Sequence, residues 1–245
     1  MTPHARRLLE LLAREPTRAE VEELNESLSE LSAAEGLVQR LTVRPEAIAG
    51  VTRARIVASA TLSGESGATS PVIERARAAW LAANAKVVAA IAEETAISLD
   101  SVSRLNAAVL GEPGPSSLRR TETFLDQEAC VVPADIPAML ERMLPAVDAR
   151  VRQRGAIWGA ALLYQWLVSV HPFEDGNGRT ARLAADWLLG EHGHLPMGFG
   201  APGDTFVALH ASLRENPSPG HAARVVARAV LRSTRLLADA CESAA

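Results

Sequence analysis

The feature that most constrains this chain of 245 residues is an uncharged stretch that runs into a polar, glycine-rich loop. No Asp, Glu, Lys or Arg occurs from Gly155 to Phe173, and a second apolar run begins at Leu183. An apolar stretch that is short for a membrane span and ends in a polar loop is typical of a buried helix. We therefore predict a core helix over residues 156–170, then a loop, then a second helix.

The loop between these helices is suited to hold an anion. Gly176 and Gly178 lack a Cβ atom, so the backbone can adopt positive φ and a ligand can approach it closely. Asn177, between them, tolerates left-handed conformations and carries an amide donor. Because the loop leads into a helix, free N–H groups and the helix dipole favour a negative charge there. The loop is therefore predicted to form an anion hole.

Four of the ionisable side chains in or beside this loop are suited to chemistry on a phosphate. Arg179 and Arg182 are three apart, so they share one face of the second helix, and both can make bidentate contacts to phosphate. Asp175 is a hard oxygen ligand that suits Mg²⁺ beside a phosphate site. His171 can accept a proton near neutral pH. This set indicates transfer of a phosphate-containing group from a nucleotide.

The stretch resembles the signature of the Fic family, H-x-F-x-[DE]-G-N-G-R-x-x-R, and the P-loop pattern is absent. Every specified position of the signature is filled, by His171, Phe173, Asp175, Gly176, Asn177, Gly178, Arg179 and Arg182. The plainer alternative is a helix–turn–helix with a glycine-rich turn and a solvated arginine face. That alternative leaves His171, Asp175 and Asn177 without a role.

The resemblance implies Mg²⁺-dependent transfer of AMP from ATP to a Ser, Thr or Tyr hydroxyl of a target protein, or of the chain itself. His171 would deprotonate the hydroxyl, and Asp175 would coordinate Mg²⁺ on the α- and β-phosphates. The remaining signature residues would bind phosphates: Gly176, Asn177 and Gly178 as the anion hole, Arg179 and Arg182 at the distal phosphates. In-line attack on the α-phosphorus would release pyrophosphate toward the arginines.

Three other functions stay open. Transfer of UMP or GMP would need only a different base pocket. A Fic-fold phosphotransferase would bind ATP reversed, but relatives that do so usually carry lysine at the second glycine, and Gly178 argues against it. A non-catalytic binding module, such as one half of a toxin–antitoxin pair, is the alternative from another class.

A second segment resembles the inhibitory helix of many Fic proteins, [ST]-x-x-x-E-[GN], whose glutamate pairs with the second signature arginine, here Arg182. One register starts at Ser59 and places Ser63 where the glutamate should be. The other keeps the acid, Glu65, but follows it with Ser66. The first register removes the partner of Arg182 and predicts constitutive activity, whereas the second preserves inhibition.

The segment from Leu118 to Leu125 matches in position the β-hairpin flap that holds the target chain in Fic proteins. Strand addition would give backbone hydrogen bonds to any target sequence. Thr121, Thr123 and Phe124 are the candidate flap residues, and an ordinary surface loop is the alternative.

Composition sets outer bounds on the fold and its setting. Hydrophobic residues make up 48% of the chain but aromatic residues only 4%, so Leu, Ala and Val must fill the core. A net charge of −4 and a pI near 5.9 argue against nucleic-acid binding by bulk charge. Cys130 and Cys241 form neither a disulfide framework nor a metal spacing, which favours a reducing, cytoplasmic setting. No stretch predicts a membrane partner.

We therefore predict a mainly α fold, a Fic-type helical bundle with a small β-hairpin flap. Residues 91–245 would form the Fic core, and residues 1–90 an N-terminal helical extension that carries the degenerate inhibitory segment. Thr17 and Glu20 form a capping box before a long helix over residues 17–41. A heptad seam on that helix would make a homo-oligomer, while a helix packed within the chain is the simpler interpretation.

Overall fold

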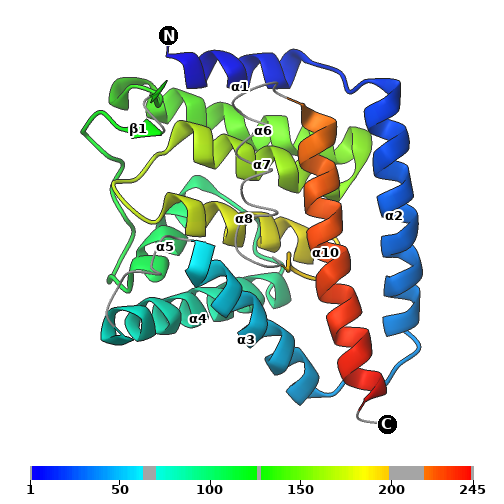
Figure 1. The fold of residues 1–245 in the computed structure, drawn as a ribbon. Helices are drawn as coiled ribbons and strands as arrows, with labels where there is room; N and C mark the ends of the chain where they lie inside the picture. The colour runs from blue at the N-terminus through cyan, green and yellow to red at the C-terminus, as the bar shows by residue number, and fades with distance from the viewer. Residues whose placement is uncertain (1, 63–69, 126–127, 199–217, 244–245) are drawn as a thin grey trace.

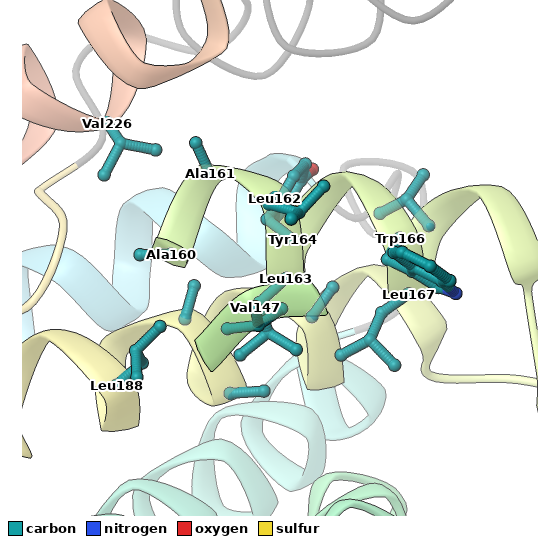
Figure 2. Packing of buried hydrophobic residues seen from close by; sticks show 14 of the residues in the cluster. Val147, Ala160, Ala161, Leu162, Leu163, Tyr164, Trp166, Leu167, Leu188 and Val226 are labelled. Carbon is teal, nitrogen blue, oxygen red and sulfur yellow. The ribbon is translucent and has the colours of Figure 1, made fainter. Parts of the chain in front are cut away.

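Helix α7, Ala156–Val170, lies at the centre of the molecule, and all 15 of its residues are buried. Figure 2 shows its side chains among those of three other helices, with Val147, Leu188 and Val226 as neighbours. A helix packed on every side leaves no face for a charged group, which explains why this stretch of the sequence has no charged residue. The predicted core helix is confirmed.

A computed structural model describes residues 2–62, 70–125, 128–198 and 218–243. It shows the predicted mainly α fold with a small antiparallel hairpin (Figure 1). The remaining helices are α1 Pro3–Ala13, α2 Arg18–Val38, α3 Pro45–Leu62, α4 Ser70–Ala92, α5 Leu99–Leu110, α6 Ile136–Arg154, α8 Asn177–Glu191 and α10 Pro219–Glu242, with a 3₁₀ turn at Pro133–Asp135. The strands are β1 Phe124–Leu125 and β2 Glu128–Ala129.

The helices α6, α7 and α8 are stacked in that order, and α10 crosses α7 (Figure 1). Helices α4 and α5 pack together, and both contact α8 from its other side. Helix α8 is thus held between the core helix and the α4–α5 pair. None of the helices in the described ranges is long and apolar enough to cross a membrane.

Helix α2 lies alongside α10 (Figure 1). The predicted capping box is present: Thr17 Oγ1 accepts from the Glu20 N–H at 3.2 Å, and the Glu20 carboxylate accepts from the Thr17 N–H at 2.7 Å. Leu24 and Leu31 are buried, and Glu30 pairs with Arg235 of α10 at 2.8 Å. The apolar face of α2 is therefore used within the chain. Whether the chain forms a homo-oligomer stays a prediction.

The helices before residue 90 share one hydrophobic core with those after it, since Leu8, Leu24 and Trp80 belong to the same cluster as Leu163 and Val226. The division into an extension and a Fic core stays a prediction from sequence. In packing terms the two parts are continuous.

A buried ion pair fixes α3 to α8. Arg55 Nη2 lies 2.5 Å from Asp186 Oδ2, with 7% and 3% of the two side chains exposed. Arg55 Nε also donates to the Met197 carbonyl at 2.8 Å, and the Met197 N–H donates to Asp186 Oδ1 at 2.7 Å. The two charges are thus hydrogen-bonded as well as paired, which a buried pair requires.

We predict that Arg55→Ala lowers the free energy of unfolding by about 3–5 kcal/mol, because it leaves Asp186 buried without its counter-ion. Urea denaturation measures this, with Arg53→Ala as the matched control. Arg53 is exposed on the same helix, and its replacement should cost less than about 0.5 kcal/mol. Equal losses in the two variants would contradict an anchoring role for Arg55.

Candidate functional site

His171 stands where α7 ends. Its φ of 49° and ψ of 61° place it in the left-handed region, and its N–H donates to the Leu167 carbonyl at 3.0 Å. Pro172 and Phe173 then return to the core, with Phe173 only 2% exposed. The chain therefore turns sharply out of the helix at His171, whose side chain is half-buried. A non-glycine residue in this conformation carries strain and recurs at functional sites.

The turn before α8 requires glycine at one position. Gly176 has φ of 77°, and a Cβ there would lie 2.8 Å from Asn106 Nδ2 and 3.2 Å from a Leu110 methyl. Asn106 is fully buried on α5; it donates to the Asp175 carbonyl at 2.9 Å and to Thr180 Oγ1 at 3.0 Å. Asn106 thus clamps both sides of the turn.

Asn177 uses its side chain within the loop. Its Oδ1 accepts from the Phe173 N–H at 2.9 Å, and its Nδ2 donates to the Phe173 carbonyl at 2.7 Å. The amide that the sequence offers as a ligand donor is therefore a structural brace. A contribution of Asn177 to an anion site would come from its backbone N–H.

The N-terminus of α8 has the geometry of an anion cradle. Its first helical hydrogen bond runs from the Thr180 N–H to the Gly176 carbonyl at 2.9 Å, so the amides of residues 177–179 precede the hydrogen-bonded turns. No side chain caps this helix within the described residues. A Cβ on Gly178 would have Arg182 Nη1 as its neighbour at 3.6 Å. Space beside Gly178 therefore adjoins a guanidinium.

Arg182 is far more buried than a solvated arginine face would be, with 1% exposed. Its guanidinium lies 5.1 Å from the ring centroid of Trp80 on α4. Burial lowers the pKa of Arg182, and the nearby Tyr164 opposes that shift. The same burial raises the pKa of Tyr164 to about 12, so Arg182 stays charged beside a neutral phenol.

Arg179 and Asp175 are neighbours at the mouth of the loop. Arg179 Nη2 lies 3.6 Å from Asp175 Oδ2, and its Nη1 donates weakly to the Val109 carbonyl at 3.4 Å. The Asp175 side chain is 78% exposed, and one of its oxygens accepts from the Gly176 N–H at 2.5 Å. Both arginines and the acid thus surround the cradle.

Asp175 fits Mg²⁺ as a single protein ligand. Within the residues that the structure describes, no three His, Cys, Asp or Glu side chains gather as a metal site. Mg²⁺ is commonly held by one or two carboxylates together with phosphates of the substrate and water. An exposed carboxylate beside an anion cradle suits that arrangement.

The predicted flap folds as a hairpin, with Phe124 paired to Ala129 and Leu125 to Glu128. Phe124 is 58% exposed, and the Thr123 carbonyl accepts from the Cys130 N–H at 2.9 Å. Residues 124–125 and 128–129 therefore form paired strands, while binding of a target there and the alternative of an ordinary surface loop both stay predictions.

The flap is joined to the signature loop at its base. Thr121 Oγ1 donates to Glu174 at 2.8 Å, and the Arg120 N–H donates to the same carboxylate at 3.1 Å. These hydrogen bonds lower the pKa of Glu174, the one from Thr121 having the larger effect. A variable position of the signature thus contacts the flap.

Of the proposed regulatory residues, Ser59 lies in the last turns of α3. Ser63 and Glu65 lie outside the described residues, so neither register is tested.

Sequence reasoning missed four residues that shape the site: Trp80, Asn106, Arg119 and Tyr164. None belongs to the signature, and all but Tyr164, which lies on the helix just before it, come from segments distant in sequence. Only Arg119 had a signal, since it lies in the segment predicted as the flap. The other three are recognised from tertiary contacts alone.

The signature loop lies within the part of the chain that is similar to known proteins. The model of the Fic/DOC family matches residues 96–189. The chain is 35% identical over 176 residues to a uridine 5′-monophosphate transferase of Xanthomonas campestris. This alignment covers 62% of this chain and 30% of the relative. It is 32% identical over 125 residues to the protein adenylyltransferase fic-1 of Caenorhabditis briggsae, covering 49% and 24%. The chain thus spans less than a third of these relatives.

Solved structures agree on the fold. A Fic-domain signaling protein from Bacteroides thetaiotaomicron superposes with a TM-score of 0.68 at 17% identity, covering 90% of this chain and 98% of that one. Fic-1 from C. elegans gives 0.69 at 19% identity, covering 93% and 74%. A complex of IbpAFic2 with adenylylated Cdc42 gives 0.60 at 15% identity, covering 94% and 75%.

The two glycines of the loop should respond differently to alanine. Gly176→Ala should lower the free energy of unfolding by about 1–3 kcal/mol, because it strains the left-handed backbone and crowds Asn106. Gly178→Ala lies inside the helix and meets Arg182 at an ordinary contact distance, so stability should be kept or rise by up to about 1 kcal/mol. Its methyl group nevertheless projects beside the cradle and should weaken binding of inorganic pyrophosphate.

Chemical denaturation and calorimetric titration with pyrophosphate measure both effects. Wild-type pyrophosphate affinity in Gly178→Ala would contradict an anion site at this helix end.

Proposed function

This chain belongs to the Fic/DOC family through residues 96–189, and we propose that it transfers AMP from ATP to a Ser, Thr or Tyr hydroxyl of a target protein. One observation carries the proposal. A half-buried histidine in a left-handed backbone is followed at once by an anion cradle that holds a buried, charged arginine at its inner edge. A base and a phosphate site in this order are the equipment for nucleotidyl transfer.

The proposed reaction moves one proton and exchanges one P–O bond. His171 accepts the proton of the target hydroxyl while its oxygen bonds to the α-phosphorus of ATP. The bond between the α-phosphorus and the bridging oxygen breaks, and pyrophosphate leaves with that oxygen. The proton on His171 then passes to solvent or to the departing pyrophosphate. Mg²⁺ held by Asp175 would offset the negative charge of the phosphates.

The distal phosphates would meet the two arginines in different ways. A phosphate resting on Gly178 would touch Arg182, whose Nη1 lies 3.6 Å from the position of a Cβ on that glycine. Arg182 thus has both Gly178 of the loop and the ring of Trp80 as neighbours. Arg179, at the mouth, would exchange its contact with Asp175 for phosphate.

The same mechanism could transfer nucleotides with different bases. A relative at 35% identity is named a uridine 5′-monophosphate transferase, so UMP transfer is the second candidate. Phosphate transfer from a reversed nucleotide is less consistent with Gly178, and a non-catalytic role leaves the geometry of His171 unused.

The proposed target would bind as an extra strand on the flap. Phe124 is exposed on β1, and the hairpin base is fixed to the signature loop by Glu174. A solved relative is described in complex with an adenylylated protein, Cdc42, which illustrates a protein target in this fold. A segment of the chain itself could occupy the same edge and become modified.

Intact mass spectrometry after incubation with Mg²⁺ and ATP tests the proposal. We expect an adduct of the mass of AMP on wild-type protein and none on His171→Ala, because the variant lacks the base while keeping the fold. Parallel incubations with UTP and GTP decide the base, and an adduct of the mass of phosphate would point to the kinase alternative. An AMP adduct of equal yield on His171→Ala would overturn the mechanism.

Regulation by the segment after α3 gives a separate prediction. Ser63→Glu should lower the initial rate of self-modification, because it restores the carboxylate partner of Arg182 in the first register. Ser66→Glu, which adds the same charge nearby, should leave the rate unchanged. An unchanged rate in Ser63→Glu, with a higher rate in Glu65→Gln, would favour the second register.

A further inference from the structure

Arg119 is a buried cation that no proposed step uses. Its residue is 2% exposed, and it lies before the flap hairpin. Charged side chains are rarely buried to this extent unless their donors are satisfied. Burial lowers the pKa of Arg119, with nearby Cys130 and Glu174 opposing the shift. A guanidinium keeps its charge under such conditions. Arg119 must therefore have partners both for its N–H donors and for its positive charge.

The donors of Arg119 converge on backbone carbonyls from three segments. Its Nε donates to His171 at 2.5 Å, and Nη2 lies 3.3 Å from the Val170 carbonyl. Its Nη1 donates to Thr121 at 2.6 Å, and Nη2 also donates to Val131. The end of α7 and both sides of the flap are thus bound to one planar group.

The backbone of Arg119 adds a further link, because its N–H donates to the Pro172 carbonyl at 2.9 Å. This bond joins the chain before the flap to the residue after His171. With the Nε bond, Arg119 holds the carbonyls on both peptide bonds that follow His171. The left-handed conformation of His171 is therefore supported from outside its own helix.

The contacts also match the electrostatics of a helix end. Carbonyls at the C-terminus of α7 lack helical donors and carry the negative end of the helix dipole. A guanidinium supplies both the missing N–H donors and a positive charge. A planar guanidinium can serve several carbonyls at fixed angles, whereas an ammonium group cannot reach three segments at once.

We propose that Arg119 is a positioning residue that joins the flap and His171 into one rigid unit, so that a hydroxyl held on the flap meets the imidazole at a fixed distance. This inference rests on the proposed function and adds to it. Nucleotide binding would be independent of Arg119, because the cradle is built by Gly176, Asn177 and the arginines of α8. Its loss should therefore reduce the rate of transfer and spare the affinity for ATP.

The kinetic test compares Arg119→Lys and Arg119→Gln with the neighbouring Arg120→Lys and Arg120→Gln. Arg120 is exposed, and only its backbone contacts Glu174, so its variants are matched controls. Self-modification is followed by mass spectrometry as a function of ATP concentration. We expect the maximal rate to fall at least tenfold in both Arg119 variants, with half-saturating ATP within twofold of wild type. The Arg120 variants should match wild type.

A second measurement does not depend on activity. The imidazole signals of His171 are identified in ¹H–¹³C spectra by their loss in His171→Ala. Hydrogen exchange is followed in the amides of residues 118–125 and 128–132. We expect Arg119→Lys to shift the His171 signals and speed flap exchange, with Arg120→Lys unchanged.

The outcomes separate the two proposals. Unchanged His171 signals and flap exchange in both folded Arg119 variants would overturn the coupling, and so would changed signals with an unchanged maximal rate. A parallel rise in half-saturating ATP would overturn selective positioning of the acceptor. A wild-type protein that transfers no nucleotide would count against the proposed function, and the spectroscopic result would still decide whether Arg119 couples the flap to His171.

Discussion

The burial of α7 on every side decides where chemistry can occur in this molecule. A helix whose circumference is fully packed offers a ligand only its ends, and the C-terminal end is where His171 leaves the helix with a left-handed backbone. The His171 side chain therefore directly follows a helix that is buried on every side. The strain at His171 is sustained because its carbonyl is bound by Arg119 and because Phe173 is anchored in the core.

A buried arginine at the proposed phosphate site has a physical rationale. Removing Arg182 from water weakens its hydration, and the ring of Trp80 replaces part of that interaction. The guanidinium stays charged, and its attraction for an anion grows as the local dielectric constant falls. Because Arg182 is already oriented beside Gly178, little reorganisation would be needed when phosphate arrives. Arg179 is more exposed, so its interaction with a ligand would be more strongly screened.

The features that the sequence predicted correctly are local ones. The core helix that ends before His171 and the capping box at Thr17 depend on neighbours within a few residues, so their pattern is visible in the chain. Tertiary contacts were not predictable in this way. The pairing of Asn177 with Phe173 turns an expected ligand donor into a brace, and the ring over Arg182 comes from a helix about a hundred residues earlier.

The contacts of Asn106 and Arg119 show the same limit. Each side chain binds backbone carbonyls, and a carbonyl has no sequence identity that a pattern could reveal. Their roles follow only when the fold brings the segments together.

Helix α8 links the site to the N-terminal helices. It carries the cradle at its start, Arg182 beneath α4, and Asp186 one turn later in the ion pair with Arg55. Arg55 lies one turn before Ser59, so the proposed regulatory segment continues from a helix that is already anchored to α8. Breaking that buried pair would cost about 3–5 kcal/mol, so α3 is held firmly on α8. A regulatory role of the segment that begins at Ser59 would therefore operate with α3 docked on the helix that carries the proposed phosphate site.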